Sequence, residues 1–208
     1  MTHGEFMNFI KEAKNVIDIE IEGLKNLSNY IDDNFCDVVD IIRNLEGHLI
    51  VTGIGKSGIV GRKISSTMSS LGTPSFFLHP SEAIHGDLGM ITNRDIILLI
   101  SNSGNSEELF CLMPAFKNIG VKTILISGNP ESELAKSCDY FLNIGKCTEA
   151  DNHNLAPTTS TIVSMALGDA LSVVISKSNK FGPKQFAKLH PGGYIGKKLT
   201  KMHNGYKT

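Results

Sequence analysis

The chain has 208 residues, 41% of them hydrophobic, and its 20 basic and 21 acidic residues leave a formal net charge of −1. This length suits one domain with its own hydrophobic core. The charge balance excludes the basic surface that nucleic-acid binding requires, and no apolar run is expected to span a membrane. Without a signal-peptide pattern or a C-x-x-C pair, we expect a cytoplasmic protein with reduced cysteines.

Residues 1–46 are predicted to form a helical N-terminal arm, part of the same domain, with a break near Asp32–Asn34. Short apolar runs then predict five strands, at 48–53, 74–79, 95–101, 121–127 and 140–145. Helical patterns lie between them at 58–71, 106–119 and 131–138, and a long apolar helix is expected from Thr161 to Lys177. Residues 47–208 therefore predict an α/β fold, a three-layer α/β/α sandwich around a five-stranded parallel sheet.

The segment GIGKSG, residues 53–58, follows the first predicted strand and has the dinucleotide-binding spacing G-x-G-x-x-G. That site needs an acidic residue at the end of the second strand, where this chain reads FLHP. The phosphate-loop pattern also fails, because its first glycine would fall on Ile50. The segment instead favours close backbone approach to a single anionic group or a developing oxyanion, beside Lys56 and Ser57.

The third predicted strand runs into SNSGNS, residues 101–106, just before a helix. Ser106 alone would be enough to cap that helix. Together Ser101, Ser103 and Ser106 offer three hydroxyls around Gly104, which favours a phosphate monoester at the helix N-terminus. The carboxyl ends of parallel strands share one edge of a sheet, where ligands bind in α/β folds. We therefore expect this segment and Lys56 to line one site.

Five motifs follow one another along the chain: TGIGKSGIVGRKISSTMSS, HGDLG, SNSGNSEE, LAPTTST and HPGGYIGKKL. Their order resembles the sugar isomerase (SIS) family of phosphosugar-binding domains, and within it the arabinose 5-phosphate isomerases, in the short form without CBS domains. The resemblance implies an aldose–ketose isomerase that interconverts D-ribulose 5-phosphate and D-arabinose 5-phosphate through an enediolate, without a cofactor. It also implies a homotetramer with shared sites that supplies 3-deoxy-octulosonate (Kdo) synthesis for lipopolysaccharide or capsule.

Matching positions imply roles for individual residues. Lys56 resembles the family's essential lysine, which stabilises an oxyanion or phosphate. Glu149 and Glu108 match its two glutamates, and we expect Glu149 to be the proton-transfer base, with Glu108 as the alternative. His85 and His190 match its histidines, and His190 is expected to act in a neighbouring subunit's pocket, in ring opening or proton shuttling. The implied substrate-binding residues are Ser57, Gly72, Thr73, His85, Ser101, Ser103, Ser106, Thr158, Thr159 and Ser160.

Some assignments stay open at this point. Glu108 on a helix fits plain surface exposure as well, whereas Glu149 shows no structural role. Asp87 is expected to fix the tautomer of His85. His79 resembles a position associated with inhibitory zinc, and the sequence has no spacing typical of a catalytic metal. Two other functions fit the fold: isomerisation of another ketose phosphate, and non-catalytic sugar-phosphate binding.

Overall fold

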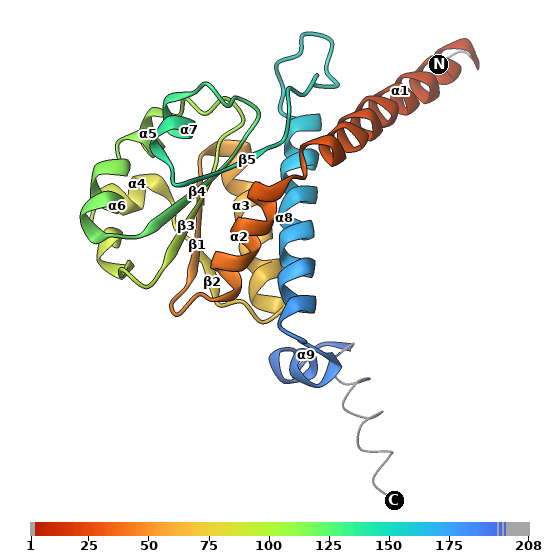
Figure 1. The fold of residues 1–208 in the computed structure, drawn as a ribbon. Helices are drawn as coiled ribbons and strands as arrows, with labels where there is room; N and C mark the ends of the chain where they lie inside the picture. Colours follow the sequence, from red (N-terminus) through yellow and green to blue (C-terminus); the bar gives the residue numbers. More distant parts are fainter. Residues whose placement is uncertain (1–2, 195, 197, 199–208) are drawn as a thin grey trace, which may run out of the picture.

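The computed structural model describes residues 3–194, 196 and 198, with side chains from residue 8 onward. Within these residues, five parallel strands form one sheet in the order β2-β1-β3-β4-β5 (Figure 1). The strands are β1 (Leu49–Gly53), β2 (Ser75–Phe77), β3 (Ile96–Ile100), β4 (Lys122–Ser127) and β5 (Tyr140–Asn143). Each lies inside its predicted run, and the predicted α/β sandwich is confirmed.

Helices cover both faces of the sheet (Figure 1). One face carries α2 (Asp33–Arg43), α3 (Gly55–Ser70) and α8 (Thr159–Ser178). The other carries α4 (Pro80–Ile84), α5 (Glu107–Phe110), α6 (Met113–Ile119) and α7 (Glu133–Ser137), with the 3₁₀ helix η2 (Asp87–Met90) after α4. Helix α1 (His3–Leu27) projects from the sandwich and joins α2 through η1 (Ser28–Tyr30), while α9 (Pro183–Leu189) lies beyond the other end of α8.

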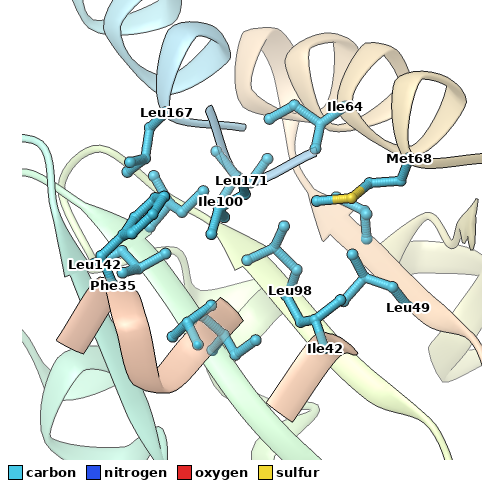
Figure 2. Close-up of a cluster of buried hydrophobic side chains, with 14 of the residues drawn as sticks. Phe35, Ile42, Leu49, Ile64, Met68, Leu98, Ile100, Leu142, Leu167 and Leu171 are labelled. Carbon is cyan, nitrogen blue, oxygen red and sulfur yellow. The ribbon is translucent and has the colours of Figure 1, made fainter. Parts of the chain in front are cut away.

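Successive strand residues face opposite layers of helices, as the two-residue period of a strand requires. On β1, Leu49 and Val51 pack with α2, α3 and α8, whereas Ile50 packs with the other layer. Figure 2 shows the first of these cores, where Ile64 of α3 and Leu171 of α8 meet above β3. Burial on both faces explains why the strands read as unbroken apolar runs.

The helix predicted over 106–119 is two helices in the structure, α5 and α6. Pro114 has no N–H to donate to the carbonyl of Phe110, and its ring crowds the preceding turn. Because of this, α5 ends at Phe110, and α6 begins at Met113 with the proline in its first turn, where the missing donor costs nothing.

Helix α8 corrects the expectation about apolar runs. By length and composition its 20 residues are apolar enough to cross a membrane, but half of that stretch is buried inside the protein. Val163, Leu167, Leu171 and Ile175 form its buried ridge. Helix α8 packs against α1, α2 and α3, so apolar residues are needed on several of its sides.

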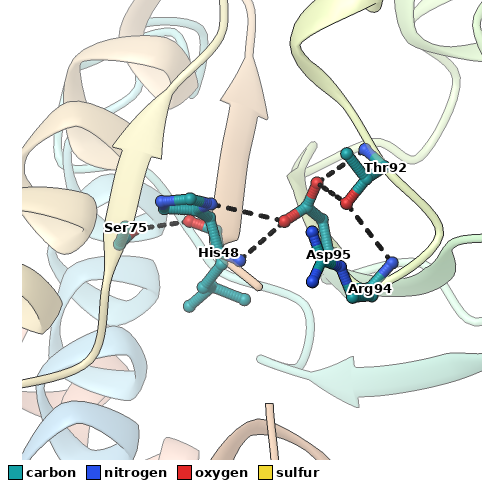
Figure 3. Close-up of polar contacts among 6 residues, drawn as sticks. His48, Ser75, Thr92, Arg94 and Asp95 are labelled. Carbon is teal, nitrogen blue, oxygen red and sulfur yellow. Dashed lines mark hydrogen bonds and ion pairs between the residues drawn. The ribbon is translucent and has the colours of Figure 1, made fainter. Parts of the chain in front are cut away.

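Asp95 ties the amino ends of β1 and β3 together (Figure 3). Its carboxylate accepts hydrogen bonds from the backbone N of His48 at 2.7 Å, and from the backbone N and Oγ1 of Thr92 at 2.6 and 2.9 Å. Burial raises the pKa of this carboxyl, but the hydrogen bonds from Thr92 and His48 stabilise the charged form, and the net effect is a lowered pKa. The buried carboxylate therefore fixes how β1 and β3 lie beside each other.

Candidate active site

The loops that follow β1 and β3 begin side by side. Gly53 and Ile100 are paired in the ladder between these strands, so the two loops start about 4.8 Å apart. A Cβ on Gly53 would lie 3.1 Å from the carbonyl oxygen of Ile100, which shows how closely the backbones meet. The next strand along the chain, β2, lies on one side of β1, and β3 lies on its other side. Parallel sheets of this strand order bind ligands where the order reverses, which here is between the carboxyl ends of β1 and β3.

The glycines of GIGKSG bring α3 close to the end of β1. Gly55 has φ +58, a conformation that favours glycine, and a Cβ on Gly58 would lie only 2.7 Å from the carbonyl oxygen of Gly53. Lys56 and Ser57 occupy the first turn of α3. The Nζ of Lys56 makes no hydrogen bond or ion pair with any residue that the structure describes, so it is available to a ligand anion.

The serine loop, residues 101–106, has one buried serine and two serines whose hydroxyls are more open to solvent. Ser101 is buried, its Oγ accepts a hydrogen bond from the backbone N of Gly104 at 3.1 Å, and it lies 2.8 Å from the Oγ of Ser106. Gly104 has φ +67, and a Cβ there would collide with Ser132. Ser103 is exposed and Ser106 is half-buried. Ser101 thus shapes the turn, while Ser103 and Ser106 can reach a ligand.

Glu149 caps the amino end of α8. Its Oε2 accepts hydrogen bonds from the backbone N of Thr158 at 2.8 Å, from Thr158 Oγ1 at 3.1 Å and from the backbone N of Ser160 at 3.2 Å. A carboxylate is favoured there by the helix dipole. The sequence analysis found no structural role for Glu149, and the structure supplies one. Its Oε1 accepts no hydrogen bond from the described part of the chain, so that oxygen is free for proton transfer.

Helices α3 and α8 bring Lys56 and Glu149 to the same edge of the sheet. Both helices begin at the carboxyl edge (Figure 1) and pack together where Ile64 fills the space above Gly168. Ile64 and Gly168 are each the tenth residue of their helix. At 1.5 Å per residue, both helices therefore start about 13 Å from this contact. The amino ends of α3 and α8 therefore lie at the same distance from their contact. Lys56 is in the first turn of α3, and Glu149 caps α8.

Thr159, the first residue of α8, turns toward α1. A Cβ on Gly23 of α1 would lie 2.4 Å from Thr159 Cγ2, and Thr159 Oγ1 is buried without a hydrogen-bond partner among the described residues. The side chain of Thr159 thus packs α1 against α8, and its contact with a substrate stays a prediction. The backbones of Thr158 and Ser160 hold the glutamate.

The other predicted residues of this edge lie on α4 and α5. Glu108 is exposed in the first turn of α5, directly after the serine loop. His85 is exposed at the end of α4, and no hydrogen bond joins it to Asp87 within the described ranges. His79 caps α4, since its Nδ1 accepts a hydrogen bond from Ser81 N at 3.2 Å. The described residues contain no group of three metal-binding side chains, and zinc at His79 stays a prediction.

Three predicted site residues lie at the opposite end of the fold. Gly72 and Thr73 follow α3, whose 16 residues carry them about 24 Å from its first turn. Gly72 packs against Phe181, which lies just after α8. His190 follows α9, beyond the far end of α8 (Figure 1). A single chain therefore does not bring these residues to Lys56 and Glu149.

Sequence reasoning missed Phe186, whose ring stacks on the imidazole of His190. The ring centroids are 3.9 Å apart and the planes differ by 10°. The four-residue spacing of Phe186 and His190 could have indicated this contact, because side chains four residues apart meet on one face of a helix.

The fold and this edge define an α/β domain with a candidate ligand site at the carboxyl ends of its parallel strands, and comparison with known proteins gives its family. Residues 41–174 match the SIS domain family, so the chain belongs to it, as its motifs predicted. The arabinose 5-phosphate isomerase KpsF of Escherichia coli is 50% identical over 177 residues, which cover 85% of this chain and 56% of that protein. KdsD of Yersinia pestis is 47% identical over 204 residues, covering 96% and 62%. The chain spans little more than half the length of these curated relatives.

A solved structure gives a match over a whole chain. The E. coli CFT073 protein c3406, solved in complex with arabinose 5-phosphate, is 36% identical and superposes with a TM-score of 0.86. The match covers 92% of this chain and 100% of that one.

Proposed function

We propose that this chain is an aldose–ketose isomerase that interconverts D-ribulose 5-phosphate and D-arabinose 5-phosphate. The observation that carries the proposal is the arrangement at the carboxyl edge of the sheet. There the ammonium of Lys56, which has no partner among the described residues, the serine loop and the carboxylate of Glu149 that caps α8 share one end of the domain. Relatives named arabinose 5-phosphate isomerases, and a structural neighbour solved with arabinose 5-phosphate, support this substrate.

The serine loop anchors the phosphate, through the hydroxyls of Ser103 and Ser106, while the carbonyl end of the sugar reaches Glu149. The free Oε1 takes a proton from C1 of the ketose, and the C1–H electron pair forms the C1=C2 bond of an enediolate. The negative charge moves to O2, where Lys56 stabilises it. Transfer of a proton from the carboxyl group of Glu149, which exchanges with solvent, to C2, and passage of the O1 proton to O2, completes the aldose.

Two further residues have assigned parts in this scheme. His85, exposed at the same edge, is the group we assign to carry the proton from O1 to O2. Glu108 is the alternative base, because it follows the serine loop directly and its side chain is exposed. The reaction exchanges only protons between neighbouring carbons and oxygens, so it needs no redox cofactor.

A second copy of the chain completes the site in this proposal. His190 and the Gly72 turn lie at the wrong end of their own chain, but a neighbouring copy can place them over the carboxyl edge. Helix α1 supports such an assembly, because Phe9, Ile10 and Ile17 are 57%, 56% and 54% exposed. We assign α1 to contacts between copies in a homotetramer with shared sites, working in the cytoplasm to supply Kdo synthesis for lipopolysaccharide or capsule.

The test is incubation of the purified protein with ribulose 5-phosphate and, separately, with six-carbon ketose 6-phosphates, followed by identification of each aldose. The proposal expects arabinose 5-phosphate from the pentulose and at least about tenfold lower kcat/KM for the hexuloses. Turnover of a hexulose phosphate alone would favour another isomerase of this fold. Saturable binding of sugar phosphates without turnover would instead indicate a binding module.

A further inference from the structure

Phe186 and His190 form one rigid unit at the end of α9. Their rings are stacked with centroids 3.9 Å apart, and Nδ1 of His190 lies 2.9 Å from the carbonyl oxygen of Phe186. Both side chains are half-buried. The stacking restricts the plane of the imidazole, and the contact with the carbonyl restricts its rotation. Two contacts to a single residue therefore fix the direction of the other ring nitrogen, Nε2.

The contact with the carbonyl also decides which nitrogen carries the proton. A carbonyl oxygen only accepts hydrogen bonds, so Nδ1 of His190 must be the donor. In the neutral imidazole Nε2 then has a lone pair and no proton. The turn after His190 holds its backbone as well, because a Cβ on Gly196 would lie only 1.8 Å from the His190 carbonyl oxygen. The ring is thus held as a proton acceptor through Nε2.

We infer that Phe186 is a positioning residue, which holds His190 as the Nδ1–H tautomer and presents Nε2 as the base that opens the sugar ring in a neighbouring copy's site. The inference rests on the proposed isomerase function. A pentose 5-phosphate forms a five-membered ring only through O4, because O5 carries the phosphate. Such an aldose must therefore open before its C2 proton can be removed.

The proton balance of ring opening fits this tautomer. Nε2 takes the proton of the anomeric hydroxyl, and the O1–H electron pair becomes the second bond of C1=O. The C1–O4 bond breaks, its electron pair moves to O4, and the imidazolium returns the proton from Nε2 to O4. Nδ1 keeps its proton throughout, so the hydrogen bond to Phe186 persists through the cycle.

Nitrogen NMR of protein labelled with ¹⁵N-histidine tests the tautomer without reference to turnover. The His190 signals are assigned by their loss in His190→Ala. The wild-type protein is expected to show a protonated Nδ1 and an unprotonated Nε2 in neutral His190, and Phe186→Tyr, which keeps the ring, is expected to show the same. Phe186→Leu keeps the backbone carbonyl but removes the ring that holds the imidazole against it, so the tautomer population is expected to shift in part toward Nε2–H. An Nε2–H tautomer in the wild-type protein would overturn the inference.

Steady-state kinetics with arabinose 5-phosphate test the positioning role. Phe186→Leu should lower kcat about tenfold with KM changed less than about twofold, since the phosphate contacts are intact, and Phe186→Tyr should restore kcat. Circular dichroism and sizing chromatography check that both variants keep the wild-type fold and assembly. Equal kcat values for wild type and a folded Phe186→Leu variant would remove Phe186 from the reaction. If the wild type shows the Nδ1–H tautomer but isomerises no sugar phosphate, the proposed function fails and the tautomer assignment stands.

Discussion

Glu149 accepts hydrogen bonds from both the backbone N and the Oγ1 of Thr158, at 2.8 and 3.1 Å. Oε2 is therefore committed to the start of α8, whereas Oε1 accepts no hydrogen bond from the residues that the structure describes. A base held in this way keeps its position while a proton moves to and from Oε1. In the proposed mechanism, the same residue therefore combines the observed structural role with a chemical one.

These two roles predict different results for two substitutions. Glu149→Ala should lower the free energy of unfolding by about 1–2 kcal/mol, because the first turn of α8 loses its cap. Glu149→Gln should destabilise the fold less but lower kcat at least about 100-fold, because an amide cannot take the proton. Urea unfolding and isomerase assays measure both, with the exposed Glu131→Gln as control. Full activity in Glu149→Gln would transfer the base role to Glu108.

Substitution of Lys56 should lower activity without lowering the stability of the fold. Its Nζ has no partner among the described residues, so Lys56→Met should leave the free energy of unfolding within about 0.5 kcal/mol of wild type. Loss of a cation beside the enediolate oxygen should lower kcat/KM at least about 100-fold. Lys117→Met, an exposed change on α6, is the matched control. Activity within a few-fold of wild type in Lys56→Met would remove this ammonium from the reaction.

Asp95 should stabilise the fold only where it is charged. Its pKa is lower in the folded protein than in the unfolded chain, so this stabilisation is present above the unfolded pKa, near 3.8, and is lost as the pH falls through the lower folded pKa. Asp95→Asn should cost about 2 kcal/mol at pH 7. The difference from wild type should shrink below pH 4 in urea unfolding at several pH values. A difference that does not change between pH 7 and pH 3 would contradict this account.

The proposal that two copies share each site predicts complementation between two inactive variants. If Lys56 and His190 of one site come from different chains, co-expression of Lys56→Met with His190→Ala leaves about a quarter of the sites with both groups intact. The mixed assembly should then show about a quarter of wild-type activity, although each variant alone is inactive. A chain that carries both substitutions, co-expressed with either single variant, should give no such recovery. No activity in the purified mixed assembly would place both groups in one chain, or remove one from the site.

The sequence was enough to predict the sheet, because strands buried on both faces contain little besides apolar residues. The loops after β1 and β3 were also predictable, since a parallel sheet places their starts together. The division of 106–119 at Pro114 could have been read from the sequence, because a proline there removes a helical donor.

Other features depend on distances that residue types do not encode. The cap from Glu149 to Thr158 depends on how the loop after β5 folds back on α8. The positions of Gly72 and His190 follow from the lengths of α3 and α8, which carry both residues away from the carboxyl edge. The order of motifs along the chain contains no information about which end of a helix each motif occupies.

We propose that this protein moves a proton between C1 and C2 of a pentose phosphate, and incubation with ribulose 5-phosphate in D₂O tests this most directly. Proton NMR should show arabinose 5-phosphate accumulating with deuterium at C2, because an enediolate held by a carboxylate exchanges its proton with solvent. Lys56→Met should form this product at least about 100-fold more slowly. Ribulose 5-phosphate that remains unchanged, without any aldose or deuterium at C1, would contradict the account.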